Sequence, residues 1–290
     1  MARTSVRISS LLALSAALLL TAGCGGDTAS DAASGTASDT PAASGGAPKK
    51  DKPVVVVTTT WEGAFAKAAG AEDVKVIVPQ SVQHAPDYDP KPSDLAAVAK
   101  ADFVLYAPFE PYAAKIKAAA GSKAKLVEVN LDNDPDKVNA EVAKLGALFG
   151  TAEAAARWKT GFDTEYAKLN TELRAAWPGG KAPSVVTQVF TAWAAKLAGA
   201  TTVGTFGPEA VTPARLAELS AKKPALVLDN AHMSTGTVLP DSGARQLKIV
   251  NYPGDDLDLL PVYRNAAAEL KKGAGGGGPV ARAGTAADVP

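Results

Sequence analysis

The sequence predicts an α/β protein with two lobes, each built on a mostly parallel four-stranded sheet flanked by helices, and joined by a long spine helix. Three observations support this fold class. Short runs rich in Val and Ile alternate with Ala-rich stretches of helical length, which is typical of parallel sheets with crossover helices. The alternation occurs twice, with four apolar runs in each half of the chain. A helical stretch over residues 152–177 separates the two halves.

The first half begins with PVVVVTTT, an apolar run that predicts a buried strand. The strands expected in this half cover residues 53–60, 74–79, 102–107 and 125–130. The helices expected between them lie near residues 61–70, 93–100 and 110–120.

The middle of the chain predicts two successive helices, over residues 136–149 and 152–177, with only Gly150 and Thr151 between them. The second helix would be about 39 Å long at 1.5 Å per residue. A helix of this length between two βα halves predicts a rigid spine that joins two lobes. A ligand would then bind in the cleft between the lobes, at the carboxyl ends of the strands.

The second half repeats the pattern of the first. Its expected strands cover residues 184–190, 201–206, 225–230 and 248–253, and its expected helices lie near residues 191–198 and 213–222. Thr212 is suited to cap the latter helix, with Pro213 at its first position.

The chain begins with a secretory signal. Arg3 and Arg7 precede an apolar run of about ten residues, Leu11 to Leu20. This run is too short to cross a bilayer, because a membrane-spanning helix needs ~20 residues. Small residues then lead to Cys24, the only cysteine in the chain, and this junction resembles the lipobox of bacterial lipoproteins. The resemblance implies acyl chains on Cys24. An ordinary cleaved signal with an unmodified Cys24 is the alternative.

These observations divide the chain into six regions. They are a lipoprotein signal peptide (1–23), the lipidated Cys with a disordered tether (24–52), an N-terminal lobe (53–135), linking helices including the spine (136–180), a C-terminal lobe (181–272) and a disordered tail (273–290).

Composition excludes several functions. A single Cys leaves no disulfide and no thiolate metal site in the folded part. Removing residues 1–23 leaves 28 basic and 30 acidic residues, so no basic surface for nucleic acid is expected. The two histidines show no spacing typical of a catalytic triad, and no H-E-x-x-H, G-x-S-x-G or phosphate-binding motif occurs. We therefore expect a monomeric binding protein with no resident cofactor, and not an enzyme.

The loop HAPDYDPKPSD, residues 84–94, carries a family resemblance, together with KADFVLYAPFE, VVTQVF and the closing IVNYPGDDLDLLPVYRNAAAEL. These segments and the order of elements resemble the zinc- and manganese-type (cluster A-I) substrate-binding lipoproteins of bacterial ABC importers. The resemblance implies an extracytoplasmic, membrane-anchored receptor. Such a receptor captures a divalent metal between two lobes and delivers it to a membrane permease.

The resemblance also implies four metal ligands, two His from the first lobe and a His or Glu plus an Asp from the second. The first His position falls on Pro86, with His84 two residues upstream. Residues 130–139 contain no His at the second position. The third and fourth positions fall on Gln188 and Asn251, whose amides are poor partners for Zn²⁺.

Two uses of the cleft follow. A rebuilt metal site would draw on His84, Asp87, Gln188, Asp229, His232 and Asn251. Alternatively, His84 and His232 are solvated loop residues, Asp87 and Asp89 cap turns, and Gln188 and Asn251 are structural amides.

A cleft for an organic ligand or a metal chelate would be lined by the aromatic residues Trp61, Tyr88, Tyr106, Phe109 and Tyr252, with Phe190 and Trp193 in the core. The expected function is capture of Zn²⁺, Mn²⁺ or a metal chelate for import. A small-molecule binder, or an accessory lipoprotein without a ligand, is the alternative.

Overall fold

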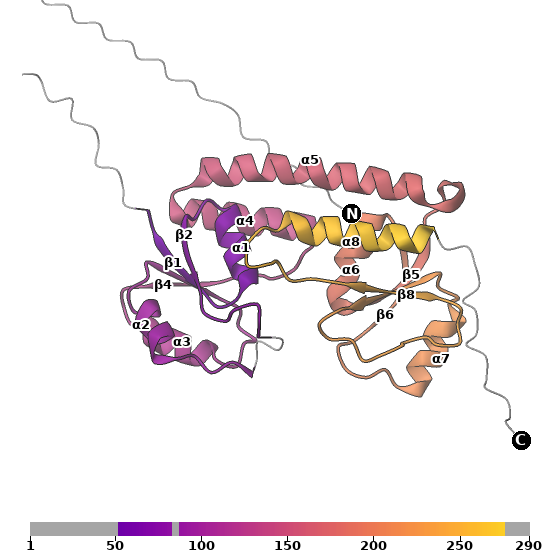
Figure 1. The fold of residues 1–290 in the computed structure, drawn as a ribbon, viewed down its shortest axis with the longest axis horizontal. Helices are drawn as coiled ribbons and strands as arrows, with labels where there is room; N and C mark the ends of the chain where they lie inside the picture. The colour runs from indigo at the N-terminus through magenta and orange to yellow at the C-terminus, as the bar shows by residue number, and fades with distance from the viewer. Residues whose placement is uncertain (1–51, 83–86, 276–290) are drawn as a thin grey trace, which may run out of the picture. The chain divides into compact units, whose positions relative to one another are not determined.

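The computed structural model describes residues 52–82 and 87–275, and contacts join the described residues into one compact unit (Figure 1). The predictions of a signal peptide, of lipidation at Cys24, of a tether and of a role for His84 lie outside the described residues. Nearly all of the predicted tail lies outside them as well.

The N-terminal lobe contains a four-stranded parallel sheet in the order β2-β1-β3-β4. Its strands are β1 (Val54–Val57), β2 (Asp73–Val76), β3 (Phe103–Tyr106) and β4 (Lys125–Glu128). Its helices are α1 (Thr60–Ala68), α2 (Pro92–Val98) and α3 (Ala113–Ala120). The central strands β1 and β3 are almost wholly buried because helices cover both faces of the sheet.

The C-terminal lobe repeats this arrangement in the order β6-β5-β7-β8. Its strands are β5 (Ser184–Gln188), β6 (Thr201–Phe206), β7 (Leu226–Asn230) and β8 (Arg245–Ile249). Its helices are the short 3₁₀ helix η3 (Val189–Thr191), α6 (Ala192–Ala198) and α7 (Pro213–Ala221). Thr212 caps α7 as predicted, accepting a hydrogen bond from the N–H of Arg215. The predicted fold class is thus confirmed.

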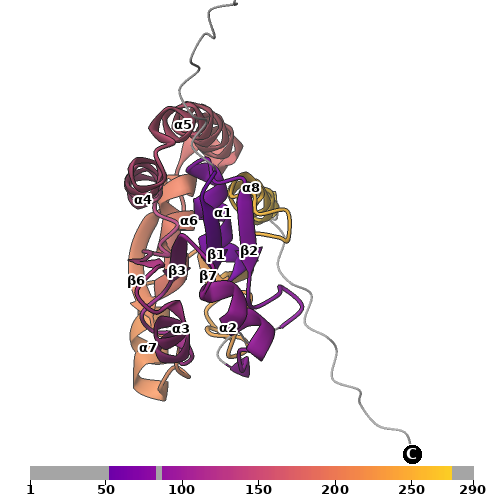
Figure 2. The same cartoon turned by 90° about the vertical axis from the view of Figure 1, so that its left-hand side faces the viewer.

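Three long helices link the lobes: α4 (Pro135–Phe149), α5 (Ala152–Ala176) and α8 (Leu260–Ala274). The spine helix α5 packs on α4 and α1 at one end and on α6 and α8 at the other. Figures 1 and 2 show it as the outermost helix, with α4 and α8 beneath it. At the turn between α4 and α5, a Cβ on Gly146 would lie 2.5 Å from that of Ala155, so only glycine permits this close approach.

Several strand boundaries differ from the sequence prediction, and one helix was not predicted. The strands expected over 53–60 and 74–79 lie at Val54–Val57 and Asp73–Val76. The strand expected over 184–190 ends at Gln188, because the Gln188 side chain caps η3 and turns the chain. The last strand covers 245–249 and not 248–253. It is an edge strand whose sequence RQLKI alternates, so an apolar run was the wrong signal. The helix α8 was not predicted as an element.

The largest core cluster runs through both lobes and the linking helices. Phe162 and Leu173 of α5 and Tyr263 of α8 are almost completely buried in it. Among the described residues, no helix combines the length and the apolar character needed to cross a bilayer.

Candidate functional site

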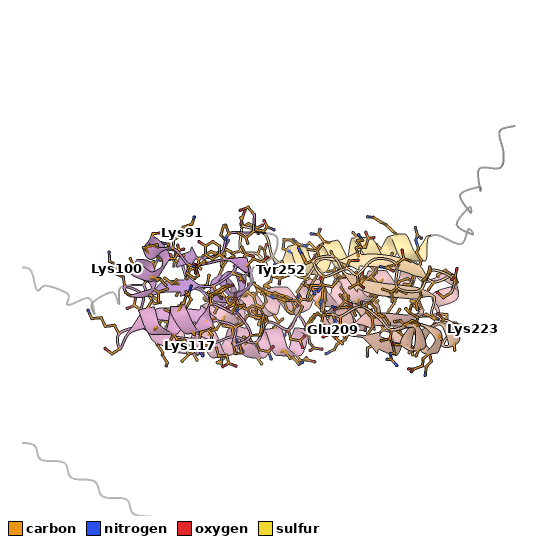
Figure 3. All side chains as sticks on the ribbon, turned by 90° about the horizontal axis from the view of Figure 1, so that it is seen from below. Lys91, Lys100, Lys117, Glu209, Lys223 and Tyr252 are labelled. Carbon is orange, nitrogen blue, oxygen red and sulfur yellow. The ribbon has the colours of Figure 1, made fainter. Side chains whose placement is uncertain are left out.

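A cavity of about 460 Å³ lies between the lobes. Its walls come from segments that follow the carboxyl ends of β1, β3, β4, β5, β7 and β8, where ligands of open parallel sheets bind. It is lined by Thr59, Trp61, Phe109, Glu110, Tyr112, Asn130, Leu131, Asp132, Asn133, Val189, Phe190, Ala192, Trp193, Asn230, His232, Met233, Asn251 and Tyr252. Figure 3 shows Tyr252 between the N-terminal half, with Lys91, Lys100 and Lys117, and the C-terminal half, with Glu209 and Lys223.

The N-terminal side of the cavity contains buried acid. Glu110 follows β3 and is only 7% exposed. Its carboxylate accepts hydrogen bonds from the N–H of Ala107 (3.0 Å) and the hydroxyl of Tyr112 (3.1 Å). Burial raises the pKa of Glu110 above its usual range. Burial raises the pKa of Tyr112 as well, reinforced by the nearby charges of Glu110 and Glu62.

Glu62, in the first turn of α1, lies next to this wall and is fully buried. Its Oε2 accepts hydrogen bonds from the hydroxyl and the N–H of Thr59, the latter at 3.0 Å. This is a capping box, which stabilises the start of α1. Burial, and then repulsion from Glu110, raise the pKa of Glu62 to about 8.

Asn133 connects the two sides of the cavity. Its Oδ1 accepts a hydrogen bond from the indole of Trp61 (3.2 Å), and its Nδ2 donates to the carbonyl of Asn251 (3.0 Å). Its own carbonyl accepts a hydrogen bond from the hydroxyl of Tyr263 (2.8 Å). The Trp61 ring also packs edge-on against Tyr252, with centroids 4.8 Å apart.

The C-terminal side of the cavity is held by the amide of Asn251, which is 1% exposed. Asn251 Oδ1 accepts a hydrogen bond from the indole of Trp193 (3.0 Å), and Nδ2 donates to the carbonyl of Phe190 (3.1 Å). Asn251 therefore lines the cavity with its side-chain amide already hydrogen-bonded within the protein.

Gln188 and Asp229 are buried but do not line the cavity. Gln188 Oε1 accepts from the N–H of Phe190 (2.7 Å), and its Nε2 has no hydrogen-bond partner among the described residues. Asp229 accepts hydrogen bonds from Ser234 and Gln246, so its carboxylate fixes the loop after β7. The structure thus places these two candidate ligands away from the cavity.

His232 lies at the cavity mouth. Its ring packs edge-on against Tyr252, with centroids 4.7 Å apart, and partial desolvation lowers its pKa. His232, Tyr252 and Thr59 also line a second hollow of about 400 Å³, whose wall includes residues 78–82. The chain then continues into residues 83–86, which the structure does not describe.

Three further candidates lie elsewhere. Asp87 is exposed on a loop outside the cavity lining. Tyr88 is wrong as a cavity residue, because its hydroxyl donates to Asp94 (2.8 Å) at the start of α2. Tyr106 is wrong for a similar reason: it is buried behind the wall, and the ammonium of Lys117 lies 4.4 Å from its ring centroid.

The remaining aromatic candidates, Trp61, Phe109 and Tyr252, do line the cavity. Phe190, expected in the core, is a correction: it is 50% exposed and lines the cavity because η3 turns it outward. Trp193 is buried in the core as expected, and it also reaches the cavity wall.

Exposed apolar side chains gather at this cavity. Six large hydrophobic residues are exposed among those described, and four of them line it: Phe109 (73%), Val189 (43%), Phe190 (50%) and Met233 (41%). An exposed apolar rim around a cavity is typical of a site that contacts an organic surface.

The sequence interpretation missed Glu62, Glu110, Asn133 and Asp132. Glu110 stands inside KADFVLYAPFE, and Glu62 is the only acid in an otherwise apolar helix start. An acidic residue in an otherwise apolar segment indicates a buried carboxyl, and this signal could have identified both residues. For Asn133 there was no signal, because its three partners lie 72 to 130 residues away in sequence.

The described residues contain no group of three or more His, Cys, Asp or Glu side chains that could hold a metal ion. At the cavity itself the ionisable metal donors are Glu110, Asp132 and His232, and Asp132 forms an ion pair with Lys137. The described part of the cavity therefore offers a bare Zn²⁺ ion fewer donors than its usual four.

Residues 55–146 match the family model described as zinc-uptake complex component A, periplasmic. A comparison with curated protein sequences finds no match.

Solved structures with the same fold include two that hold a metal ion. The laminin-binding protein Lbp of Streptococcus pyogenes is 16% identical, with a TM-score of 0.58 over 77% of this chain and 98% of that one. The substrate-binding protein FpvC of Pseudomonas aeruginosa, in complex with Mn²⁺, is 14% identical, with a TM-score of 0.58 over 77% and 98%. The Zn(II)-bound ZnuA-like domain of Streptococcus pneumoniae AdcA is 17% identical, with a TM-score of 0.52 over 77% and 99%.

The expected resemblance is confirmed by the family match in the first lobe and by a fold shared across both lobes. The chain thus resembles the zinc- and manganese-type (cluster A-I) substrate-binding proteins of ABC importers, through a family match over residues 55–146 and a shared two-lobed fold.

Proposed function

We propose that the chain is the extracytoplasmic, lipid-anchored receptor of such an importer, and that it captures a divalent metal together with an organic carrier. The carrier would supply most of the metal ligands, and the cavity between the lobes would enclose the complex. The observation that carries the proposal is the pairing of an apolar rim with a small set of donors at the family's binding position.

The donors argue against a bare ion as the ligand. The amide of Asn251 is already hydrogen-bonded to Trp193 and Phe190, and recruiting it would cost those bonds. Gln188 does not line the cavity. A metal that arrives with ligands of its own needs only one or two protein donors, and His232, Glu110 or Asp132 can supply these.

The rim favours a ligand with an organic exterior. Phe109 of the N-terminal lobe and Phe190 of the C-terminal lobe both line the cavity, and both are at least half exposed. Covering them with a ligand would bury apolar surface at about 25 cal/mol per Å². A hydrated ion offers no such surface.

An open cavity also supports ligand capture over an accessory role without a ligand. About 460 Å³ is within the range of small-molecule sites, and apolar side chains do not fill it. Anchoring through Cys24 after removal of residues 1–23 would hold the receptor beside its permease.

The test is isothermal titration of the chain without its first 24 residues, stripped of metal. The titrants are Zn²⁺, Mn²⁺, bipyridine and the zinc–bipyridine complex. We expect stoichiometric binding of the complex and markedly weaker binding of each component alone. Tight binding of free Zn²⁺ would contradict the need for a carrier. If neither the free metals nor the zinc complex binds but bipyridine alone does, the chain is a small-molecule receptor and the metal function is contradicted.

A further inference from the structure

Two buried carboxyl groups lie together at the N-terminal side of the cavity, and we call Glu62 and Glu110 the buried acid pair. Glu62 comes from α1 and Glu110 from the segment after β3, so the fold brings them together from 48 residues apart. Their proximity is electrostatically significant, since the charge of Glu110 raises the pKa of Glu62.

The pair has no cationic partner. Among the described residues, no Lys, Arg or His forms an ion pair with Glu62 or Glu110. Glu62 Oε1 is buried and has no hydrogen-bond partner in the described structure. Burial without a cation favours the protonated forms of both carboxyls, and a cation that entered the cavity would favour the ionised form of Glu110.

Helix capping explains only part of the arrangement. The capping box uses Glu62 Oε2, and a neutral Gln at this position would serve equally well. It does not account for Oε1, nor for a second buried carboxyl at Glu110.

The described cavity lining contains acidic side chains but no Lys or Arg. Its acids are Glu110 and Asp132, of which Asp132 pairs with Lys137 and Glu110 has no cationic partner among the described residues. His232 adds little positive charge near neutral pH, because desolvation lowers its pKa. A wall of this kind repels anions and attracts cations.

Aromatic side chains complete the wall. They are Trp61, Phe109, Tyr112, Phe190, Trp193 and Tyr252. The faces of such rings attract cations that shed their water easily, above all alkylated ammonium groups. Aromatic faces beside an uncompensated carboxylate are the features that recognise an organic cation.

We propose that the cavity recognises a positively charged group with an apolar exterior, which is held against Glu110 and between the aromatic side chains. Two sources share this chemistry: an alkylated ammonium compound, and the outer face of a cationic metal complex. The inference rests on the proposed function for the location of the site, but not for the identity of the ligand.

The test compares isosteres that differ in charge. The chain without its first 24 residues is titrated with choline and with dimethylbutanol, its neutral carbon analogue. We expect choline to bind roughly tenfold more tightly, because cation–π and carboxylate contacts act on the charged form only. Equal binding, preference for the neutral compound, or no binding of either would overturn the inference.

A pair of variants assigns the effect to the acid pair. Glu110→Gln should reduce choline affinity by about tenfold and leave dimethylbutanol unchanged. Glu153→Gln, on the exposed surface of α5, is the matched control and should bind like the parent chain. If Glu110→Gln changes both ligands equally, or unfolds while Glu62→Gln folds and binds choline unchanged, the acid pair does not recognise the charge.

The metal complexes separate this inference from the proposed function. If the cationic zinc–bipyridine complex and choline each bind, the result supports both the proposed function and the cation site. Choline binding without any metal complex would remove the metal function and keep the cation site. Binding of a neutral zinc complex without choline would do the reverse.

Discussion

The two sides of the cavity solve the problem of buried polar groups in different ways. On the C-terminal side, Asn251 donates and accepts within the protein, and its neighbours Trp193 and Phe190 are satisfied by it. On the N-terminal side, Glu62 and Glu110 are buried and form no ion pair with a described cation, and Glu62 Oε1 has no hydrogen-bond partner among the described residues. The C-terminal amide has its hydrogen-bond partners within the protein, whereas the N-terminal carboxyls can still accept a partner from a ligand.

The two sides of the cavity therefore have different roles, one in its geometry and the other in its electrostatics. The C-terminal side sets the geometry of the cavity through neutral hydrogen bonds of the Asn251 amide. The N-terminal side provides carboxyl groups whose ionised forms a cationic ligand would favour. Asn133 connects them, since it bonds Trp61 on one side and Asn251 on the other.

The largest effect is expected from Asn251→Leu. The change removes the hydrogen-bond partner of the buried Trp193 indole and that of the Phe190 carbonyl, which should lower the free energy of unfolding by about 3–5 kcal/mol. Urea unfolding measures the loss. Asn265→Leu, on the exposed face of α8, is the control and should change stability by less than about 0.5 kcal/mol. A small effect at Asn251 would show that this side is not held by its amide.

The pH dependence of stability tests the acid side. Glu62 has a pKa of 4.5 when unfolded and about 8 when folded, so the folded state favours the protonated form. Its contribution is fully present below pH 4.5 and is lost as pH rises through 8. We expect the free energy of unfolding to fall by about 2–4 kcal/mol between pH 5 and 8.5.

Glu62→Gln should remove most of that slope, because a neutral amide does not titrate. The groups that act on Glu62 electrostatically or by hydrogen bonding are Glu110 and Thr59, and the tyrosines Tyr112 and Tyr252 respond to its charge. Urea unfolding at several pH values measures the slope. Stability that rises over this range, or a variant with the parent slope, would contradict the account.

Trp61→Phe tests the link between the sides. An aromatic ring is kept, but Asn133 Oδ1 loses the one donor that it has among the described residues, and we expect a loss of about 1–2 kcal/mol in the free energy of unfolding. Trp158→Phe is a suitable control, since this indole stacks on Phe162 and has no hydrogen bond among those described. An equal loss in both variants would mean that packing, and not the bridge, is responsible.

The smallest effect on stability is expected at the rim. Phe109 is 73% exposed, so Phe109→Ala should change the free energy of unfolding by less than about 0.5 kcal/mol. It should nevertheless weaken choline binding several-fold, because an aromatic face is lost. Leu126→Ala, exposed but outside the cavity, should leave binding unchanged. Unchanged binding in Phe109→Ala would exclude the rim from the site.

The sequence was informative where the signal was local. Strands and helices followed from apolar periodicity, and the cap at Thr212 from two adjacent residues. The cavity residues Trp61, Phe109 and Tyr252 followed from their positions at strand ends. Tyr88 and Tyr106 shared that position but pack against α2 and Lys117, and a sequence does not show which way such a side chain turns.

The parts that escaped prediction depend on contacts across the chain. Asn133 has all its partners in distant segments, and the acid pair exists only because α1 lies beside the segment after β3. The binding roles of His84, Asp87 and His232 stay predictions.

The central claim is that the N-terminal side of the cavity holds a buried acid pair whose ionised form a cationic ligand favours, and carboxyl ¹³C NMR tests it most directly. The Glu resonances of the chain without its first 24 residues would be followed with pH, and assigned with Glu62→Gln and Glu110→Gln. The account predicts that the Glu62 carboxyl titrates near pH 8, and that adding choline lowers this midpoint. Titration of both carboxyls near 4.5, unmoved by choline, would contradict it.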